Sequence, residues 1–295
     1  MRIVILHNPG SGRGRAARIA RFAAESLRAD GHEVQPAPPR PDTPTLAGLL
    51  DPGTLLVVAG GDGTVHRSLP ALIESRAALY HLPLGTENLF SREFSMGGPE
   101  VLAAALREPR FTPIDLMRVR SAGVDEPAAL MVSVGPDASI LARLSRRRRG
   151  PIHRLSYAPH ILAELLGPAV YPLTIEVDAQ PAVLARPGLA VVANCAMYAL
   201  GLNPAPDAHP ADGVLDLAFI EGSLALSLLP RLARASRTNE SIVRLRGKTF
   251  RITADAGAHA QADGEPIPQA LGGLDLSIGV LPGAIRILRP VQSVA

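Results

Sequence analysis

The sequence lacks several residues and motifs on which whole classes of protein depend. Cys195 is the only cysteine among 295 residues, so no intramolecular disulfide forms, which fits a reducing cytoplasm. Four histidines share no metal-ligand spacing with it or with one another and are interpreted as surface or core residues: His66, His81, His153 and His160. Neither a G-x-S-x-G motif nor an internal repeat occurs, which removes the commonest hydrolase and solenoid patterns.

Long apolar segments are also missing. A membrane-spanning helix takes ~20 consecutive apolar residues, whereas the nearest candidate, residues 189–202, is shorter and contains Asn194. The apolar run at residues 3–6 is too short for a signal peptide and predicts a strand instead. We therefore expect a cytoplasmic protein.

Lysine is nearly absent, since Lys248 is the only one and almost all of the 30 basic residues are arginine. The G-x-x-x-x-G-K-[ST] phosphate loop is excluded, because no such sequence surrounds Lys248. Arginine is the better bidentate phosphate ligand, although a GC-rich genome explains the bias more simply. The net charge of +3 gives no indication of nucleic acid as a partner.

The bulk composition is that of a globular protein, with 47% hydrophobic and 19% charged residues and enough length for two domains. Up to about residue 113, apolar runs alternate with helical periods, which predicts a parallel sheet with helices on both faces. Beyond it, apolar and polar residues alternate singly at 173–178, 215–219 and 250–253, which predicts an antiparallel sandwich or barrel. We expect an α/β domain at 1–113 and a β domain at 114–283.

The most informative stretch is residues 55–64. Five apolar residues without alternation, 55–59, predict a strand buried on both faces. Gly60-Gly61-Asp62-Gly63-Thr64 follows, and a helical stripe begins at Val65. A strand, a glycine turn and a helix N-terminus make an anion site, because free N–H groups and the helix dipole point at it. The residues alone leave two interpretations open: phosphates with Mg²⁺ between them and Asp62, or a tight turn capped by Asp62 and Thr64.

A second glycine-rich loop lies between the first predicted strand and the first predicted helix. Gly12, Gly14 and Ala17 fit the G-x-G-x-x-A dinucleotide fingerprint. That fingerprint needs an acidic residue near the end of the second strand, where this chain has prolines followed by Arg40. The match to a dinucleotide site is therefore weak.

Residues 60–64 resemble the GGDGT signature of the superfamily of diacylglycerol kinases, sphingosine kinases and NAD kinases. Five further segments resemble motifs of the lipid kinases, and together the six span nearly the whole chain in order. The five are N-P-x-x-G at 8–12, P-x-G-T-x-N at 83–88, G-x-D-A at 135–138, D-G-x-L at 212–215 and D-G-E at 263–265. On this resemblance the chain is identified as a member of the diacylglycerol kinase family.

The resemblance implies a three-layer α/β domain with a parallel sheet, like that of NAD kinase and diacylglycerol kinase, and a C-terminal antiparallel β-sandwich domain for the lipid. It also implies that residues 284–295 return to the first domain. ATP and Mg²⁺ are the implied cofactors, and Arg13 and Arg15 are placed to meet phosphate oxygens. The implied nucleotide-binding residues are Asn8, Pro9, Gly10, Ser11, Gly12, Gly60, Gly61, Asp62, Gly63, Thr64, Thr86 and Asn88.

The implied reaction transfers the γ-phosphate of ATP to a lipid hydroxyl, such as that of diacylglycerol, in a cleft between the domains. Asp62 would hold Mg²⁺ through water, and Glu265 would be the general base. In some members a structural Mg²⁺ binds at the D-G-x-L segment, which implies Asp212 with the carbonyl groups of His209 and Val214. Asp-Gly is also the commonest hairpin turn, so that interpretation of Asp212 stays open.

One departure from the family pattern concerns the metal. Leu89 stands where the family has an acidic residue that joins a water and metal network, and Glu87 and Glu93 are the candidate substitutes. Two alternative functions follow. An NAD kinase shares residues 60–64 but is disfavoured by the motifs at 83–88 and 263–265. A catalytically silent module that binds lipid or nucleotide is supported by Leu89.

The partner expected is a lipid substrate, with peripheral contact to the inner membrane face. Arg143 and residues 146–149, all arginine, precede a predicted amphipathic helix at 153–166. Such a run binds anionic lipid at roughly 1 kcal/mol per arginine, while a solvated loop before a packed helix is the alternative. A further helix is predicted at 224–237, and the oligomeric state is not indicated.

Overall fold

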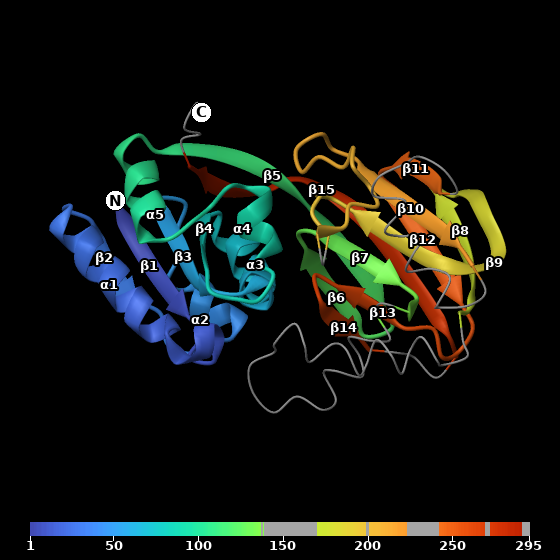
Figure 1. Ribbon diagram of the computed structural model, residues 1–295, viewed down its shortest axis with the longest axis horizontal. Helices are drawn as coiled ribbons and strands as arrows, with labels where there is room; N and C mark the ends of the chain where they lie inside the picture. The colour runs from blue at the N-terminus through green and yellow to red at the C-terminus, as the bar shows by residue number, and fades with distance from the viewer. Residues whose placement is uncertain (137, 139–169, 199–200, 223–241, 269–271, 291–295) are drawn as a thin grey trace. The chain divides into compact units, whose positions relative to one another are not determined.

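The computed structural model describes residues 1–136, 138, 170–198, 201–222, 242–268 and 272–290, and the chain divides into two compact units (Figure 1). Unit 1 comprises Met1–Ile114 and Gly283–Ala295, and unit 2 comprises Asp115–Pro282. The chain enters unit 2 within strand β5 (Arg110–Ser121) and returns to unit 1 within β15 (Leu274–Arg289).

Unit 1 is built on a parallel sheet in the order β2-β1-β3-β4-β15. Its strands are β1 (Arg2–His7), β2 (Glu33–Pro36), β3 (Thr54–Gly60) and β4 (Ala78–Pro83), with the end of β15 parallel to β4. Every residue of β3 is buried. The prediction of a strand covered on both faces at 55–59 is thus confirmed.

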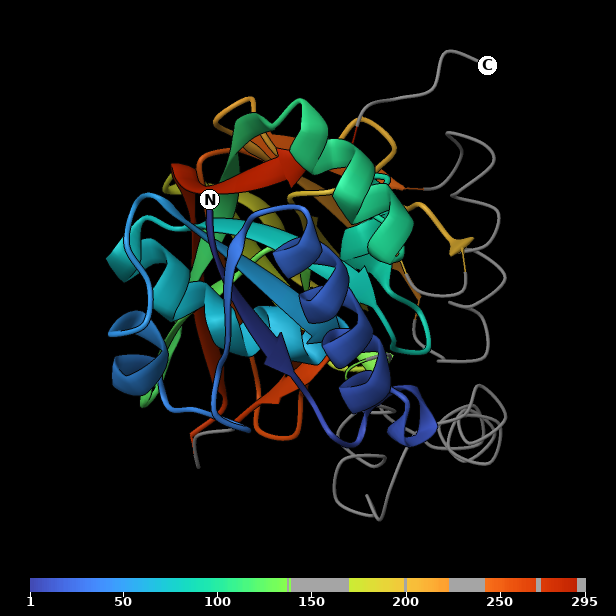
Figure 2. The same cartoon turned by 90° about the vertical axis from the view of Figure 1, so that its left-hand side faces the viewer.

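Helices cover both faces of this sheet, which confirms the three-layer prediction. They are α1 (Ala16–Ala29), α2 (Thr43–Ala47), α3 (Asp62–Ser75), α4 (Leu89–Glu93) and α5 (Pro99–Arg107), with a short 3₁₀ helix η1 (Ser11–Gly14) before α1. Helices α1 and α5 contact each other on one face, and α2 contacts α3 on the other (Figure 2). This follows from right-handed crossovers, because β1 to β2 and β3 to β4 step in opposite directions across the sheet.

Unit 2 is antiparallel, as the single alternation predicts. Besides β5 and β15 its strands are β6 (Val124–Ala128), β7 (Met131–Val134), β8 (Pro172–Val177), β9 (Gln180–Ala193), β10 (Leu215–Glu221), β11 (Val243–Gly247), β12 (Thr249–Ala254), β13 (Ala260–Ala262) and β14 (Glu265–Ile267). The pairing order is β14-β13-β7-β9-β8-β12-β15, with β10 between β9 and β11. The long strand β9 pairs with β8 through its first half and with β7 and β10 through its second.

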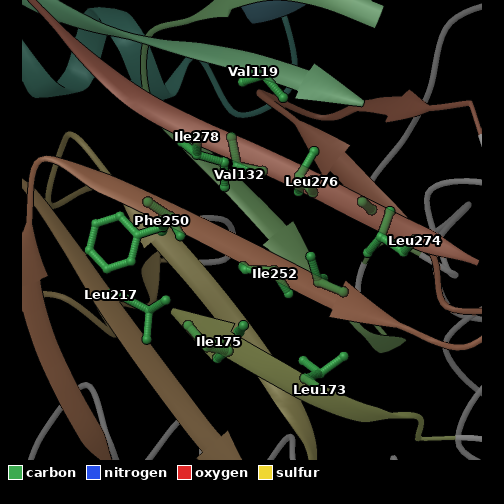
Figure 3. Packing of buried hydrophobic residues seen from close by; sticks show 14 of the residues in the cluster. Val119, Val132, Leu173, Ile175, Leu217, Phe250, Ile252, Leu274, Leu276 and Ile278 are labelled. Atoms are coloured by element: carbon green, nitrogen blue, oxygen red, sulfur yellow. The ribbon is translucent and has the colours of Figure 1, made fainter. Parts of the chain in front are cut away.

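The core of unit 2 consists of the inward-facing members of these alternating strands (Figure 3). Leu173 and Ile175 of β8 are buried with Phe250 and Ile252 of β12, and Leu217 of β10 joins them. Thus period-two alternation places one side chain of each pair in the core and the next toward the outer face.

Several sequence expectations lie outside the described residues. These are the helices expected at 153–166 and 224–237, the arginines at 143 and 146–149, and Asp137 of the G-x-D-A segment. In the part of the chain that the structure describes, no helix is both long enough and apolar enough to cross a membrane.

Candidate functional site

Three of the sequence motifs meet at one edge of the unit 1 sheet. Parallel neighbours end at the same edge, so the loops after β1, β3 and β4 lie side by side. The N–H of Asn8 donates to the carbonyl of Ala59 at 3.2 Å, and the N–H of Leu84 donates to that of Gly60 at 2.7 Å. The Asn8 amide also donates to the hydroxyl of Thr64, at 3.4 Å. The segments 8–12, 60–64 and 83–88 therefore lie together and form one candidate site.

Glycine is required where two of these loops touch. A Cβ on Gly85 would lie 2.7 Å from the Cα of Gly61, and a Cβ on Gly61 would lie 3.1 Å from the Cα of Gly85. A Cβ on Gly60 would come within 2.7 Å of the Thr64 hydroxyl. Larger residues would separate the loops, so the glycines keep the backbone of both motifs in contact.

The N-terminus of α3 faces this edge without a side-chain cap. Gly61 is the N-cap residue and has an extended backbone, and its carbonyl accepts the N–H groups of Thr64 and Val65 at 2.8 and 3.3 Å. An uncapped N-terminus of a 14-residue helix favours anions through its dipole and its orphan N–H groups. The alternative in which Asp62 and Thr64 cap this helix is wrong, because their side chains bind elsewhere.

The carboxylate of Asp62 instead caps α4. One oxygen accepts the N–H of Leu89 and the other that of Phe90, each at 3.0 Å. An ionised carboxylate offers about four acceptor positions, so roughly two remain for other ligands. The Asp62 side chain thus fixes the start of α4, which follows the loop at 83–88, and its oxygens can still accept hydrogen bonds or bind a cation.

The described residues fit a magnesium ion that is carried mainly by phosphates. Among them, no group of three or more His, Cys, Asp or Glu side chains could hold a metal. Mg²⁺ in phosphoryl-transfer sites commonly uses one or two carboxylates together with substrate phosphates and water. Asp62 is the carboxylate that the geometry offers for this purpose.

Asn88 shapes the third loop, and Thr86 is its exposed polar residue. Asn88 adopts the left-handed conformation, with φ of 50°, and its side-chain oxygen accepts the Gly85 N–H at 2.7 Å. Its amide nitrogen donates to the Gly85 carbonyl at 3.1 Å. Both polar atoms of Asn88 are therefore engaged in holding the loop.

Leu89 occupies the position of the family's acidic residue, and its side chain is buried, with 7% exposure. Only its backbone N–H reaches Asp62. This position therefore contributes to the core of unit 1, and Glu87 and Glu93, both half-buried, stay the candidates for the acidic role.

His81 is a member of the site that no sequence pattern distinguished from an ordinary core histidine. It lies on β4, is fully buried, and its Nε2 is 3.0 Å from the Gly60 carbonyl oxygen. Burial lowers the pKa of His81, and the nearby Asp62 carboxylate opposes that shift. A neutral imidazole that donates a hydrogen bond from Nε2 to the Gly60 carbonyl fits this position and helps to hold the glycine loop at the end of β3.

In unit 2, the D-G-E segment forms a hairpin between β13 and β14. Ala262 pairs with Glu265, and the two residues between them have positive φ, 50° at Asp263 and 87° at Gly264. Two left-handed residues define a type I′ turn, which favours Asp-Gly. Asp263 is buried, whereas Glu265 is half-buried at the start of β14.

The predicted Mg²⁺ ligands of the D-G-x-L segment already take part in hydrogen bonds and an ion pair within unit 2. One oxygen of Asp212 accepts the Val214 N–H at 3.2 Å, and the other forms an ion pair with Arg246. The carbonyl of His209 accepts the N–H of Ala211 at 2.9 Å. Arg246 thus supplies positive charge beside Asp212, and Mg²⁺ binding by Asp212, His209 and Val214 stays a prediction.

A neighbouring carboxyl is affected by the same surroundings. Burial raises the pKa of Asp216, while the Arg246 guanidinium, whose Nε lies 3.7 Å from Asp216 Oδ1, acts in the opposite direction.

The backbone of Gly135, in the G-x-D-A segment, has φ of 139°, and its N–H donates to the His259 carbonyl at 3.0 Å. A glycine is required at 135 for this conformation.

Two models of known protein families together match most of this chain. The family model of the diacylglycerol kinase catalytic domain matches residues 2–119, and that of the YegS C-terminal NAD kinase beta sandwich-like domain matches residues 130–289. A diacylglycerol kinase of Mycobacterium tuberculosis (strain H37Rv) is 28% identical over 303 residues, which cover 98% of this chain and 95% of the relative. A probable lipid kinase YegS-like of Pseudomonas aeruginosa (strain PAO1) is 29% identical, covering 81% of this chain and 77% of the relative.

Solved structures share the fold. A putative diacylglycerol kinase from Bacillus anthracis has a TM-score of 0.75 at 18% identity, covering all of this chain and 96% of that one. Yeast NADH kinase complexed with NADH has a TM-score of 0.56 at 11% identity, covering 99% of this chain and 84% of that one.

Proposed function

The chain belongs to the diacylglycerol kinase family, with a catalytic domain of that family followed by a YegS-type domain, and from this premise we propose that it is an ATP- and Mg²⁺-dependent kinase of diacylglycerol. Lipid kinase activity is what this membership supports, and the curated relatives are diacylglycerol kinases and probable lipid kinases. The observation that carries the proposal is the meeting of three phosphate-loop motifs at one sheet edge, beside the uncapped N-terminus of α3.

ATP binding would use the backbone of the three loops in unit 1. Orphan N–H groups at the start of α3 and the exposed Thr86 would receive phosphate oxygens, and Asn8 and Asn88 hold the loops in shape. Asp62 would bind Mg²⁺ through water with the acceptor positions that α4 leaves open. When bound, the ion neutralises phosphate charge during the transfer.

Glu265 would take the proton of the lipid hydroxyl. Its half-buried carboxylate stands at the start of β14, where the hairpin turn fixes the backbone. As the hydroxyl oxygen bonds to the γ-phosphorus, the bond to the β–γ bridging oxygen breaks, ADP leaves and the proton moves to Glu265. A carboxylate at this place suits general-base chemistry, because it gains a proton without a change of position.

The two alternatives are separated by particular segments. An NAD kinase shares residues 60–64 and the fold, but the motifs at 83–88 and 263–265 are those of the lipid branch. A catalytically silent module is favoured by Leu89, a buried leucine at the position where the family has an acidic residue. The chain has carboxylates at both positions that the proposed mechanism uses, Asp62 and Glu265, and this supports a working kinase.

We also propose that the protein meets its substrate as a peripheral protein on the cytoplasmic face of an anionic membrane. The proposed contact is the run of four arginines at 146–149, which lies outside the described residues. Arginines near anionic headgroups each add roughly 1 kcal/mol of binding.

The deciding experiment incubates the purified full-length protein with labelled ATP and a total lipid extract, and in parallel with NAD. We expect label to enter a chloroform-soluble product only when Mg²⁺ is present, and identification of that product gives the lipid. Label in a water-soluble dinucleotide would establish the NAD kinase instead. The absence of any Mg²⁺-dependent ATP turnover, with a folded protein, would establish the silent module.

A further inference from the structure

The aspartate of the D-G-E hairpin is bound far more extensively than a turn requires. Its side chain is buried, with 8% exposure, and its two oxygens accept three backbone N–H groups. The donors are Ala129 at 2.7 Å, Leu130 at 2.8 Å and Met131 at 3.1 Å. These residues are consecutive: the first two connect β6 to β7 and Met131 begins β7, so Asp263 ties the hairpin to a segment more than a hundred residues earlier in the chain.

That connecting segment is itself held firmly. The side-chain amide of Asn194, 1% exposed, donates to the carbonyl of Ala129 at 2.9 Å, and the Asn194 N–H donates to that of Leu130 at 3.0 Å. The N–H of Asp263 completes the contact by donating to the Met131 carbonyl at 2.9 Å. The segment 129–131 is thus a fixed support for the hairpin.

Gln261, on strand β13, is a second side chain that holds the hairpin in place. This side chain is 2% exposed, its oxygen accepts the Gly264 N–H at 2.6 Å, and its nitrogen donates to the Ser133 hydroxyl at 2.7 Å. Each atom of the amide is therefore used, and β13 is locked to β7 beside the turn.

A type I′ turn by itself asks only for residues that tolerate positive φ, and Asn-Gly serves as well as Asp-Gly. A buried carboxylate is unfavourable unless several donors satisfy it, and charge-assisted hydrogen bonds to N–H groups then become strong. The buried charge at Asp263 thus gives rigidity that the turn type does not explain.

We propose that Asp263 is a positioning residue, which fixes the β13–β14 hairpin on segment 129–131 so that Glu265 keeps its place in phosphoryl transfer. The inference rests on the proposed role of Glu265 as general base. A misplacement of about 1 Å in a catalytic group can lower a rate roughly 100-fold, so rigidity at this hairpin has a direct kinetic consequence. Gln261 supports the same arrangement.

The chain contains a matched control in a second type I′ hairpin. Asp178 and Ala179, with φ of 48° and 63°, join β8 to β9. The Asp178 carboxylate accepts the N–H groups of Lys248 and Thr249 at 3.0 and 2.8 Å. Asp178 is exposed, and its hairpin carries no proposed catalytic residue.

The experiment is a double-mutant cycle on Asp263→Asn and Glu265→Gln, with Asp178→Asn as the control. Asparagine keeps the turn, but its amide nitrogen would face backbone donors, so the three-fold contact is lost. We expect Asp263→Asn to lower kcat about tenfold or more, with KM for ATP within about twofold of wild type. In the Glu265→Gln background the same change should lower kcat less than about twofold, and Asp178→Asn should behave like wild type.

The outcomes separate this inference from the proposed function. An equal loss from Asp263→Asn in both backgrounds overturns the positioning role while leaving the kinase assignment intact. Wild-type kcat in Glu265→Gln overturns the role of Glu265 and the inference together, although lipid phosphorylation by the wild-type protein still stands. If Asp263→Asn does not fold, Gln261→Met removes the second contact at similar volume, and the same two backgrounds decide.

Discussion

Asp62 and Leu89 are joined by a hydrogen bond in which the Leu89 N–H donates to the Asp62 carboxylate at 3.0 Å. The aspartate of the GGDGT motif thereby holds the start of α4 and, through it, the loop at 83–88. One side chain therefore couples two of the loops proposed to bind nucleotide, so a substitution at Asp62 would disturb the loop at 83–88 as well as the proposed metal contact.

Replacement of Asp62 by Asn is expected to reduce lipid phosphorylation at least about 100-fold, since loss of a charge-stabilising contact commonly costs ~3 kcal/mol of transition-state energy. The amide also places its nitrogen against an N–H of Leu89 or Phe90, so Tm should fall by a few degrees. Steady-state kinetics and thermal melting measure both effects.

The matched control for this change is Asp42→Asn. Asp42 caps α2, a helix of five residues like α4, by accepting the Thr45 N–H at 2.9 Å. It should lose some stability and keep its activity. Near wild-type phosphorylation by a folded Asp62→Asn protein would contradict the metal assignment.

Replacement of Glu265 by Gln is expected to lower kcat about 100-fold or more while ATP affinity and Tm hardly change. An amide keeps the shape of the side chain but accepts no proton, and loss of a general base typically costs ~10²–10⁴ in rate. The loops proposed to bind ATP lie in unit 1, whereas Glu265 lies in unit 2. A fall of less than about threefold would place the base elsewhere, with Asp62 the next candidate, and loss of ATP binding would assign Glu265 to the metal network.

We expect His81 to make the stability of unit 1 depend on pH. Its folded pKa is lowered by burial from the ordinary value of 6.5, so the unfolded chain binds more protons just below pH 6.5. The stability that the neutral imidazole contributes is fully present above pH 6.5 and is lost as the pH falls below it. We expect the Tm advantage of wild type over His81→Gln to shrink between pH 7.5 and 5.5. A constant difference would show that His81 does not titrate on unfolding.

Membrane docking is tested by replacing the four arginines at 146–149 with glutamine. Vesicle binding should weaken only with anionic lipid, and the difference should fade as salt rises, because surface charges are screened within ~10 Å at 0.1 M. A control with the same loss of charge replaces Arg110, Arg118, Arg120 and Arg251, which are ion-paired in the structure. Equal sedimentation of all three proteins with anionic vesicles at low salt would favour the solvated-loop interpretation.

Much of the fold could be read from residue periodicity. Five apolar residues at 55–59 predicted a strand buried on both faces, and single alternation at 173–178 and 250–253 predicted the antiparallel strands. The meeting of the loops after β1, β3 and β4 follows from the geometry of a parallel sheet. The spacing of apolar residues predicts these strands correctly because burial follows a regular pattern along each of them, continuous in β3 and alternating in β8 and β12.

The remainder depends on contacts between residues far apart in the chain. The N–H groups bound by Asp62 lie 27 and 28 residues away, and those bound by Asp263 lie more than 130 residues away. Backbone donors carry no sequence signal, so neither contact could be recognised beforehand. His81 likewise sits in an apolar run, where nothing marks its contact with Gly60.

Leu89 stands where the family has an acidic residue. Leu89→Asp restores the acid in sequence, but the side chain is 7% exposed and its N–H is bound to Asp62. A carboxylate there would be buried beside a second negative charge, which raises its pKa and destabilises the folded state at neutral pH. We expect Tm to fall well below that of Leu89→Met, a volume-conserving control, and phosphorylation to fall with it. The Tm deficit should narrow at acidic pH, where the new carboxyl is protonated. A stable and more active Leu89→Asp protein would instead show that this position can face the metal, and that its leucine limits the activity of the chain.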